Sequence, residues 1–377
     1  MARKGENIYK RKDGRYEGRY IISYNENGKA KYGYIYDKTY TGAKDKLLQA
    51  KTSLTSLNLG NKNHNDTKYE FWLYEWLSKK KLAVKDSTYI RYRNIVEKHI
   101  SPFLGKYPIR KISTSLMEKF VKTKLENGKL DKSGGVSPKM MSDMIVIIKE
   151  TFKYANSNGV STICDFSGIS IRRSPHEMRV LSNSEEKRLL SVLSSDTDCY
   201  KLGVFICLFT GIRIGELCAL QWKNISFVDG TLRVEQTMQR LQYEDKRSTQ
   251  KTRIIITEPK SFTAIRTIPL PSFLLEVMLP FAANPNAYVV SGDCKEYVEP
   301  RTMQNRFKTY LLEGGIADAN FHSLRHTFAT RCVEIGFDIK TLSEILGHSS
   351  VKITLDKYVH SSMELKRTNM EKLSDRF

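Results

Sequence analysis

HSLRH, residues 322–326, begins a segment that continues as TFATRCVEIG and carries apolar residues at helical spacing. It places two histidines and an arginine side by side, whereas a helix that needed only solubility would carry lysine and glutamate. His322 and Arg325 are three residues apart, so they share one face of the predicted helix. This face indicates a functional site, to which the rest of the chain must contribute.

The composition of the chain favours a polyanionic partner. Its 377 residues allow two or three domains, and 40% hydrophobic residues are enough for real cores. Lys and Arg number 62 against 41 Asp and Glu, which gives a formal net charge of +21 and favours nucleic acid over a membrane surface. The sequence has no membrane-spanning apolar run and no apolar core of a secretory signal near its N-terminus. We therefore expect a soluble intracellular protein.

The cysteines do not predict a metal site. They lie far apart, without a CxxC pair or a histidine set at zinc-ligand spacing. We interpret all of them as reduced thiols that behave as small buried hydrophobic residues. They are Cys164, Cys199, Cys207, Cys218, Cys294 and Cys332.

Residues 1–60 are predicted to form a small sheet and one helix. Aromatic and polar residues alternate over residues 8–39, and Asp13-Gly14 and Asn27-Gly28 favour tight turns, so we expect three antiparallel strands. A helix within residues 39–57 would cover one face. The other face would carry basic residues among tyrosines and could reach DNA bases and phosphates, although a basic sheet that docks on the protein itself is an alternative. These residues are Arg15, Arg19, Lys29 and Lys31.

A helical bundle is predicted over residues 66–165, after a polar linker at residues 60–67. Four segments show apolar residues at spacings of three and four, and each has a Ser, Thr or Asp near its start. They are residues 68–80, 87–105, 113–128 and 137–159. Their basic outer faces are an ordinary solvated surface unless DNA lies against them.

Residues 175–377 are predicted to be mainly helical, with one strand-rich stretch. Ser182 and Glu185 resemble a capping box that begins a helix. β-Branched runs within residues 227–240 and 253–271 indicate a small antiparallel sheet. Lys260 falls in a turn region inside the second of these ranges, between its β runs.

Further residues with phosphate chemistry follow in this region. TGIRIGEL (210–217) puts Arg213 and Glu216 on one face at a helix start, although alone they are equally well explained as a structural ion pair. LGHSS (346–350) presents His348 just past a helix end, and Tyr358 follows ten residues later. Two arginines, a lysine and two histidines can all donate to a phosphate. Because no carboxylate cluster for two metals accompanies them, the set favours metal-free phosphoryl transfer with tyrosine as nucleophile and lysine as proton donor.

In this order, these motifs resemble the signature set of the tyrosine recombinases, the integrase family of phages and mobile elements. The resemblance extends over roughly residues 175–365 and includes all six expected catalytic positions. It implies that five residues activate the scissile phosphate, that Tyr358 attacks it and that Glu216 supports the site. The five are Arg213, Lys260, His322, Arg325 and His348.

The resemblance implies a multidomain protein with a function in DNA recombination. The expected domains are an arm-type DNA-binding domain at residues 1–60, a core-binding domain at 66–165 and a catalytic domain at 175–377 with a C-terminal tail helix. The expected activity is integration and excision of a mobile element through a covalent 3′-phosphotyrosine and a Holliday junction, without metal, cofactor or ATP. The expected partners are double-stranded DNA, a homotetramer on DNA, an excisionase and DNA-bending proteins. The expected location is the bacterial cytoplasm, at the nucleoid.

Some alternatives remain open. We expect His326 to point away from the site into the core. The tail residues Met363, Met370, Leu373 and Phe377 form one apolar helical stripe, which packs on its own domain or docks into a neighbouring subunit. A DNA-binding regulator that does not cleave, a relaxing enzyme like the type IB topoisomerases and a metal-dependent transposase or nuclease are the rival functions.

Overall fold

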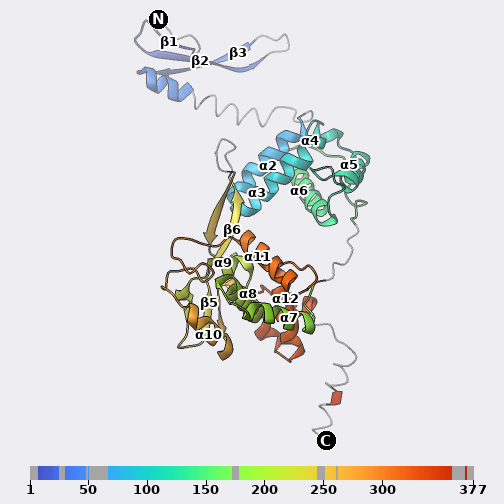
Figure 1. The fold of residues 1–377 in the computed structure, drawn as a ribbon. Helices are drawn as coiled ribbons and strands as arrows, with labels where there is room; N and C mark the ends of the chain where they lie inside the picture. The colour runs from blue at the N-terminus through green and yellow to red at the C-terminus, as the bar shows by residue number, and fades with distance from the viewer. Residues whose placement is uncertain are drawn as a thin grey trace. The chain divides into compact units, whose positions relative to one another are not determined.

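A computed structural model describes residues 7–24, 30–47, 50, 67–171, 178–243, 251–259, 262–358 and 370–371. The chain divides into two compact units, Met1–Arg173 and Ser174–Phe377 (Figure 1). Over the described ranges, none of the helices combines the length and the apolar character needed to cross a membrane.

The first unit begins with a three-stranded antiparallel sheet, as predicted. Its strands β1 (Ile8–Lys10), β2 (Tyr16–Tyr24) and β3 (Ala30–Asp37) lie in sequence order, and residues 40–47 are helical. Gly14 has a φ of 85° in the turn between β1 and β2, so the Asp13-Gly14 turn is present. The predicted turn at Asn27-Gly28 lies outside the described residues. The helix covers one sheet face, where Ala43 and Leu47 pack against the strands.

The four predicted helices of the bundle are all present. They are α2 (Tyr69–Ala83), α3 (Asp86–Ile95), α5 (Thr114–Asn127) and α6 (Pro138–Ser157), and α3 continues through a π-helical turn (Val96–Ile100) into α4 (Ser101–Leu104). The hydroxyls of Ser113 and Ser137 accept hydrogen bonds from backbone N–H groups in the first turns of α5 and α6, which explains where these helices begin. Large aromatic and aliphatic side chains fill the bundle core.

The second unit surrounds the buried helix α8 (Cys199–Thr210), which contacts α7 (Asn183–Ser194), α9 (Ile214–Ala219), α10 (Ser272–Met278), α11 (Pro300–Glu313) and α12 (His322–Glu334). Helices α13 (Ile339–Leu346) and α14 (Val351–Tyr358) follow. Both halves of the predicted Ser182–Glu185 capping box are formed. Because α8 is buried and apolar from Leu202 to Leu208, the other elements can bury their own apolar faces against it.

The strand-rich stretch of the second unit forms two small antiparallel sheets. One contains β4 (Ile225–Ser226), β5 (Thr231–Val234) and β8 (Arg266–Pro269), and the other is a hairpin of β6 (Thr237–Gln242) and β7 (Thr252–Thr257). The predicted sheet is therefore present, but it is divided, because β5 pairs with the distant β8.

The cysteines are unpaired. Cys207, Cys218 and Cys332 are buried as predicted, whereas Cys164 and Cys199 are only half-buried. Cys294 is exposed because it lies in the loop before α11, so the prediction for this residue is wrong. Most of the tail stripe, including Met363, Leu373 and Phe377, lies outside the described residues.

Candidate active site

Three helix ends meet at the predicted site in the second unit. Helix α8 ends at Gly211, which has a φ of 65°, and α13 ends at Gly347, which has a φ of 64°. Both glycines adopt the left-handed conformation that commonly ends a helix. The third end is the first turn of α12, which begins at His322.

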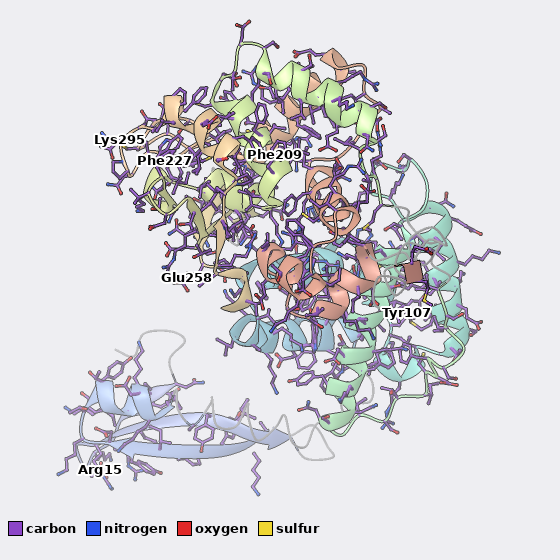
Figure 2. The ribbon with its side chains drawn as sticks, turned by 90° about the horizontal axis from the view of Figure 1, so that it is seen from below. Arg15, Tyr107, Phe209, Phe227, Glu258 and Lys295 are labelled. Carbon is purple, nitrogen blue, oxygen red and sulfur yellow. The ribbon has the colours of Figure 1, made fainter. Side chains whose placement is uncertain are left out.

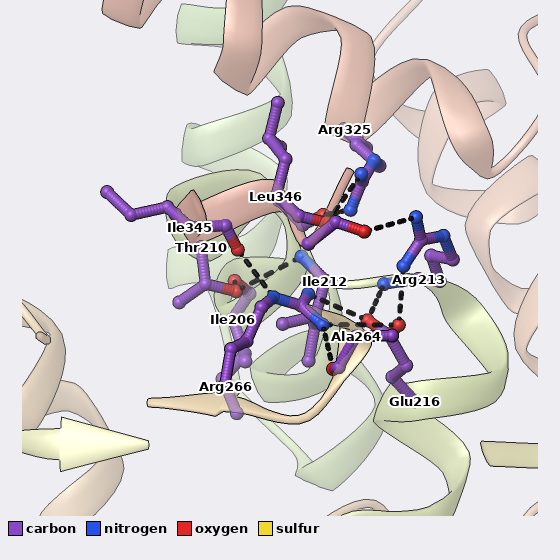
Figure 3. A network of polar contacts seen from close by, with 12 residues as sticks. Ile206, Thr210, Ile212, Arg213, Glu216, Ala264, Arg266, Arg325, Ile345 and Leu346 are labelled. Carbon is purple, nitrogen blue, oxygen red and sulfur yellow. Dashed lines mark hydrogen bonds and ion pairs between the residues drawn. The ribbon is translucent and has the colours of Figure 1, made fainter. Parts of the chain in front are cut away.

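Arg325 is buried between the ends of α8 and α13. Its side chain donates from Nη1 to the carbonyl oxygen of Gly211 at 2.8 Å and from Nη2 to that of Leu346 at 2.7 Å (Figure 3). Carbonyl groups at helix C-termini carry partial negative charge and have no partner within their own helix. Burial and the nearby charge of Arg213 lower the pKa of Arg325 to about 9, so the guanidinium remains protonated at neutral pH.

Glu216 connects two further arginines. It accepts from Arg213 at its backbone N–H (2.9 Å) and at Nη1 (2.7 Å), and from Arg266 Nη2 at 2.9 Å (Figure 3). Burial alone would raise the pKa of the Glu216 carboxyl, but the charges and hydrogen bonds of Arg266 and Arg213 outweigh it and lower that pKa. The ionised carboxylate thus fixes Arg213, whose side chain remains 37% exposed.

A cavity of about 290 Å³ opens beside these arginines. Four of the six predicted catalytic residues line it, namely Arg213, His322, Arg325 and His348. The remaining lining residues are Gly347, Ser349, Ile353 and Lys357. Lys260 lies outside the described residues.

The two cavity histidines are neutral at neutral pH. Burial, with the positive charges of Arg325 and Arg213 among the further causes, lowers the pKa of His322 to about 4 and that of His348 to about 3. His348 also lies within hydrogen-bond distance of Thr354, with 2.8 Å between its Nδ1 and the threonine Oγ1. Since Nδ1 of His348 is engaged there, its Nε2 is the nitrogen available to a ligand.

Tyr358 is the last residue of α14 and lies next to the cavity. Its side chain is 5% exposed, and its ring lies parallel to that of His348, with 6.4 Å between centroids. Its hydroxyl lies 2.9 Å from Nδ1 of His326. The prediction that His326 points into the core is therefore wrong. His326 is four residues after His322 in α12, so the helix pitch brings both rings to one face, 4.6 Å apart.

Two family models match this sequence. The model of the phage integrase family matches residues 179–364, and that of the phage integrase N-terminal SAM-like domain matches residues 68–125. Together they cover well over half of the sequence. The chain belongs to the phage integrase family. It is a tyrosine recombinase, an enzyme of site-specific DNA recombination.

Other members of the family resemble the chain over most of its length. The XerC-like tyrosine recombinase of Caldanaerobacter subterraneus subsp. tengcongensis is 26% identical over 389 residues, which cover 94% of this chain and 95% of that protein. The match to the structure of the Tn1549 transposon integrase with transposon right end DNA covers 82% of this chain and 100% of the integrase chain in that structure (TM-score 0.65, 20% identity). The match to the structure of a lambda integrase tetramer bound to a Holliday junction covers 95% of this chain and 98% of the lambda integrase chain (TM-score 0.57, 19% identity). The two structures show that the fold is shared.

The N-terminal sheet of this phage integrase family member presents arginines and tyrosines on the face opposite its helix. The guanidinium carbon of Arg19 lies 3.5 Å from the ring centroid of Tyr32, and Arg15 lies over Tyr36 at one end of the sheet (Figure 2). Lys31 pairs with Ser23 beyond a register shift, and alternation along β3 puts Lys31 on the helix-covered face. Its predicted place on the open face is therefore wrong. Lys29 lies outside the described residues.

Two charged residues of the site, Arg266 and Lys357, were not among the predicted site residues. Arg266 is buried on β8 and points to the same side of the strand as Ile268, two residues later. A charged residue at such an inward position indicates a buried partner of opposite charge. That signal was present in the sequence. Lys357 lines the cavity from α14, and no feature of its local sequence distinguishes it from a surface lysine.

Loss of Arg266 should destabilise the second unit strongly. Arg266→Met keeps much of the side-chain length but leaves the buried Glu216 with Arg213 alone, so we expect a loss of about 3–5 kcal/mol in the free energy of unfolding. Arg240→Met is the control, because it removes a more exposed pair with Glu299 and should cost less than about 1 kcal/mol. Chemical unfolding followed by circular dichroism measures both, and equal losses would contradict the buried network.

Proposed function

We propose that this recombinase cleaves DNA by attack of Tyr358 on a scissile phosphate held in the cavity. The observation that carries the proposal is that Arg213, Arg325, His322 and His348 line one cavity and that the Tyr358 ring lies against His348. Two fixed guanidinium groups can hold a phosphodiester and offset the charge that builds up in its transition state. Because Arg213 and Arg325 bring like charges into one cavity, a bound anion would be stabilised there.

The proposed reaction conserves the phosphodiester bond energy. The phenolic oxygen of Tyr358 bonds to phosphorus, the bond to the 5′ oxygen breaks, and a 3′-phosphotyrosine and a 5′ hydroxyl result. Attack by the 5′ hydroxyl of another strand reverses the step and joins that strand, so neither ATP nor metal is needed. The sequence motif assigns protonation of the leaving oxygen to Lys260.

We assign the parts of the chain to the parts of a DNA site. Residues 175–377 would carry out catalysis, and residues 66–165 would bind core-type DNA. Residues 1–60 would bind arm-type DNA through Arg15 and Arg19 on the open sheet face. The proposed assembly on DNA is a homotetramer assisted by an excisionase and DNA-bending proteins, and integration and excision of a mobile element would be its function. The lambda integrase tetramer on a Holliday junction, which shares the fold, supports the assembly.

A covalent adduct tests this function. A duplex selected from a random pool by binding to the protein is nicked near its centre, incubated with protein in EDTA without ATP, and resolved by denaturing electrophoresis. Wild type should give a protein-linked band, and Tyr358→Phe should give none, because the nucleophilic oxygen is gone. Tyr310→Phe removes another buried hydroxyl of the same unit and should retain the band. An adduct with Tyr358→Phe, or loss of the wild-type band in EDTA, would contradict the proposal.

The open sheet face predicts a salt-dependent DNA contact. Arg19→Gln should weaken binding of the full chain to selected duplexes and lower the slope of log K against log salt by about one, because one phosphate contact is lost. Lys31→Gln removes the same charge from the opposite face and should leave the slope unchanged. Titrations at several KCl concentrations measure both variants, and identical slopes would show that this face does not bind DNA.

A further inference from the structure

We propose that His326 accepts the phenolic proton of Tyr358 when this side chain attacks phosphorus. The inference deepens the proposed function and rests on it, since Tyr358 must be the nucleophile. It gives a chemical role to a histidine that adjoins the predicted H-x-x-R pair in sequence and that the sequence analysis placed in the core.

The geometry places one nitrogen of His326 at the reacting oxygen. Nδ1 of His326 lies 2.9 Å from the Tyr358 hydroxyl, and the two rings are 5.8 Å apart at 48°. Helix α12 supplies the histidine and α14 supplies the tyrosine, so the contact depends on the packing of these two helices. The distance lies within the range in which a general base takes a proton directly.

Burial and the positive charges around His326 keep its ring neutral. Lys357 faces it from α14, Arg325 and His322 lie on its own helix, and Tyr358 is its hydrogen-bond partner. Burial first, and then the positive charges of Lys357 and Arg325, lower the pKa of His326 to about 4. A neutral imidazole has one nitrogen with a free lone pair. The proposal assigns this lone pair to Nδ1, which then accepts from the Tyr358 hydroxyl while Nε2 carries the hydrogen.

The nucleophile needs such an acceptor. Burial raises the pKa of the Tyr358 phenol, and the charges of Arg325 and Arg213 only partly offset this effect. The phenolate therefore does not form spontaneously near neutral pH. His348 is less suited to take the proton, because its Nδ1 is engaged with Thr354 and it lines the phosphate cavity.

The step balances in atoms and charge. As the bond between the Tyr358 oxygen and phosphorus forms, the phenolic proton moves to Nδ1 of His326 and gives an imidazolium. The bond between phosphorus and the 5′ oxygen breaks, and that oxygen takes a proton from the general acid that the motif assigns to Lys260. When the strands rejoin, the imidazolium returns its proton to the departing tyrosine oxygen.

The test is the pH dependence of single-turnover cleavage of the nicked duplex described above, between pH 6 and 9. In His326→Asn, the amide oxygen still accepts a hydrogen bond near the position of Nδ1 but cannot take the proton. We expect cleavage about 10²-fold slower than wild type at pH 7. The rate of the variant should rise about tenfold per pH unit, because the tyrosine must then ionise to solvent. The cleavage rate of wild type should change little between pH 6 and 9.

Controls separate this role from a structural one. His99→Asn makes the same change at a buried histidine of the other unit and should leave the pH profile unchanged. If His326→Asn lowers the thermal unfolding temperature, His326→Gln provides a second variant with the same expected slope. A loss that is equal at every pH would overturn the inference in favour of positioning alone. A cleavage rate equal to or above that of wild type would also overturn the inference. It would show that the contact only holds the Tyr358 side chain in a resting position.

The outcomes distinguish this inference from the proposed function. If wild type forms no adduct through Tyr358, the proposed function fails and the role of His326 fails with it. If wild type forms the adduct and His326→Asn cleaves with an unchanged pH profile, the proposed function stands and only the role of His326 is removed.

Discussion

Two hydrogen bonds hold the buried Arg325 side chain between the carbonyl groups of Gly211 and Leu346. The rest of the site depends on this contact. The two hydrogen bonds join the C-terminal ends of α8 and α13 to α12, and they satisfy carbonyl oxygens that have no partner within their own helices. A Cβ on Gly211 would lie 2.5 Å from the Phe328 ring, so only glycine fits this turn without rearrangement. The chain then continues directly into Arg213 and the first turn of α9. One buried guanidinium therefore places the second arginine of the cavity.

Glu216 gives this arrangement its electrostatic character. It is ionised and buried, and it balances Arg266 while it orients Arg213 toward the cavity. The cavity itself is then positive, because its two histidines are neutral while Arg213, Arg325 and Lys357 carry charge. A site of this kind is arranged for an anion before the anion arrives, which is the condition under which fixed donors stabilise a transition state most effectively. Tyr358, the proposed nucleophile, lies beside this charge, with its hydroxyl 2.9 Å from Nδ1 of the neutral His326.

Local rules in the sequence predicted much of this structure. Helix starts at Ser113, Ser137 and Ser182 follow from side-chain capping, and the positions of Arg213, His322 and His348 follow from helix pitch and helix ends. The predictions failed where distant residues decide the outcome. The pairing of β5 with β8, for example, divides the sheet. Lys31 is a local failure, because alternation along β3 puts it on the same face as the buried Gly33. His326 is a different case, because the four-residue spacing from His322 was visible, but its partner on α14 was not.

We propose that Arg213 and Arg325 act by neutralising the charge of the scissile phosphate. The most direct measurement compares cleavage by wild type and Arg213→Ala on two duplexes, one with an ordinary phosphate and one with a neutral methylphosphonate at the scissile position. Cleavage by Arg213→Ala should be about 10²–10³-fold slower than wild type on the phosphate duplex and nearly as fast as wild type on the methylphosphonate duplex, where no charge needs a partner. An equal loss on both duplexes would contradict the proposal and would assign Arg213 a structural role.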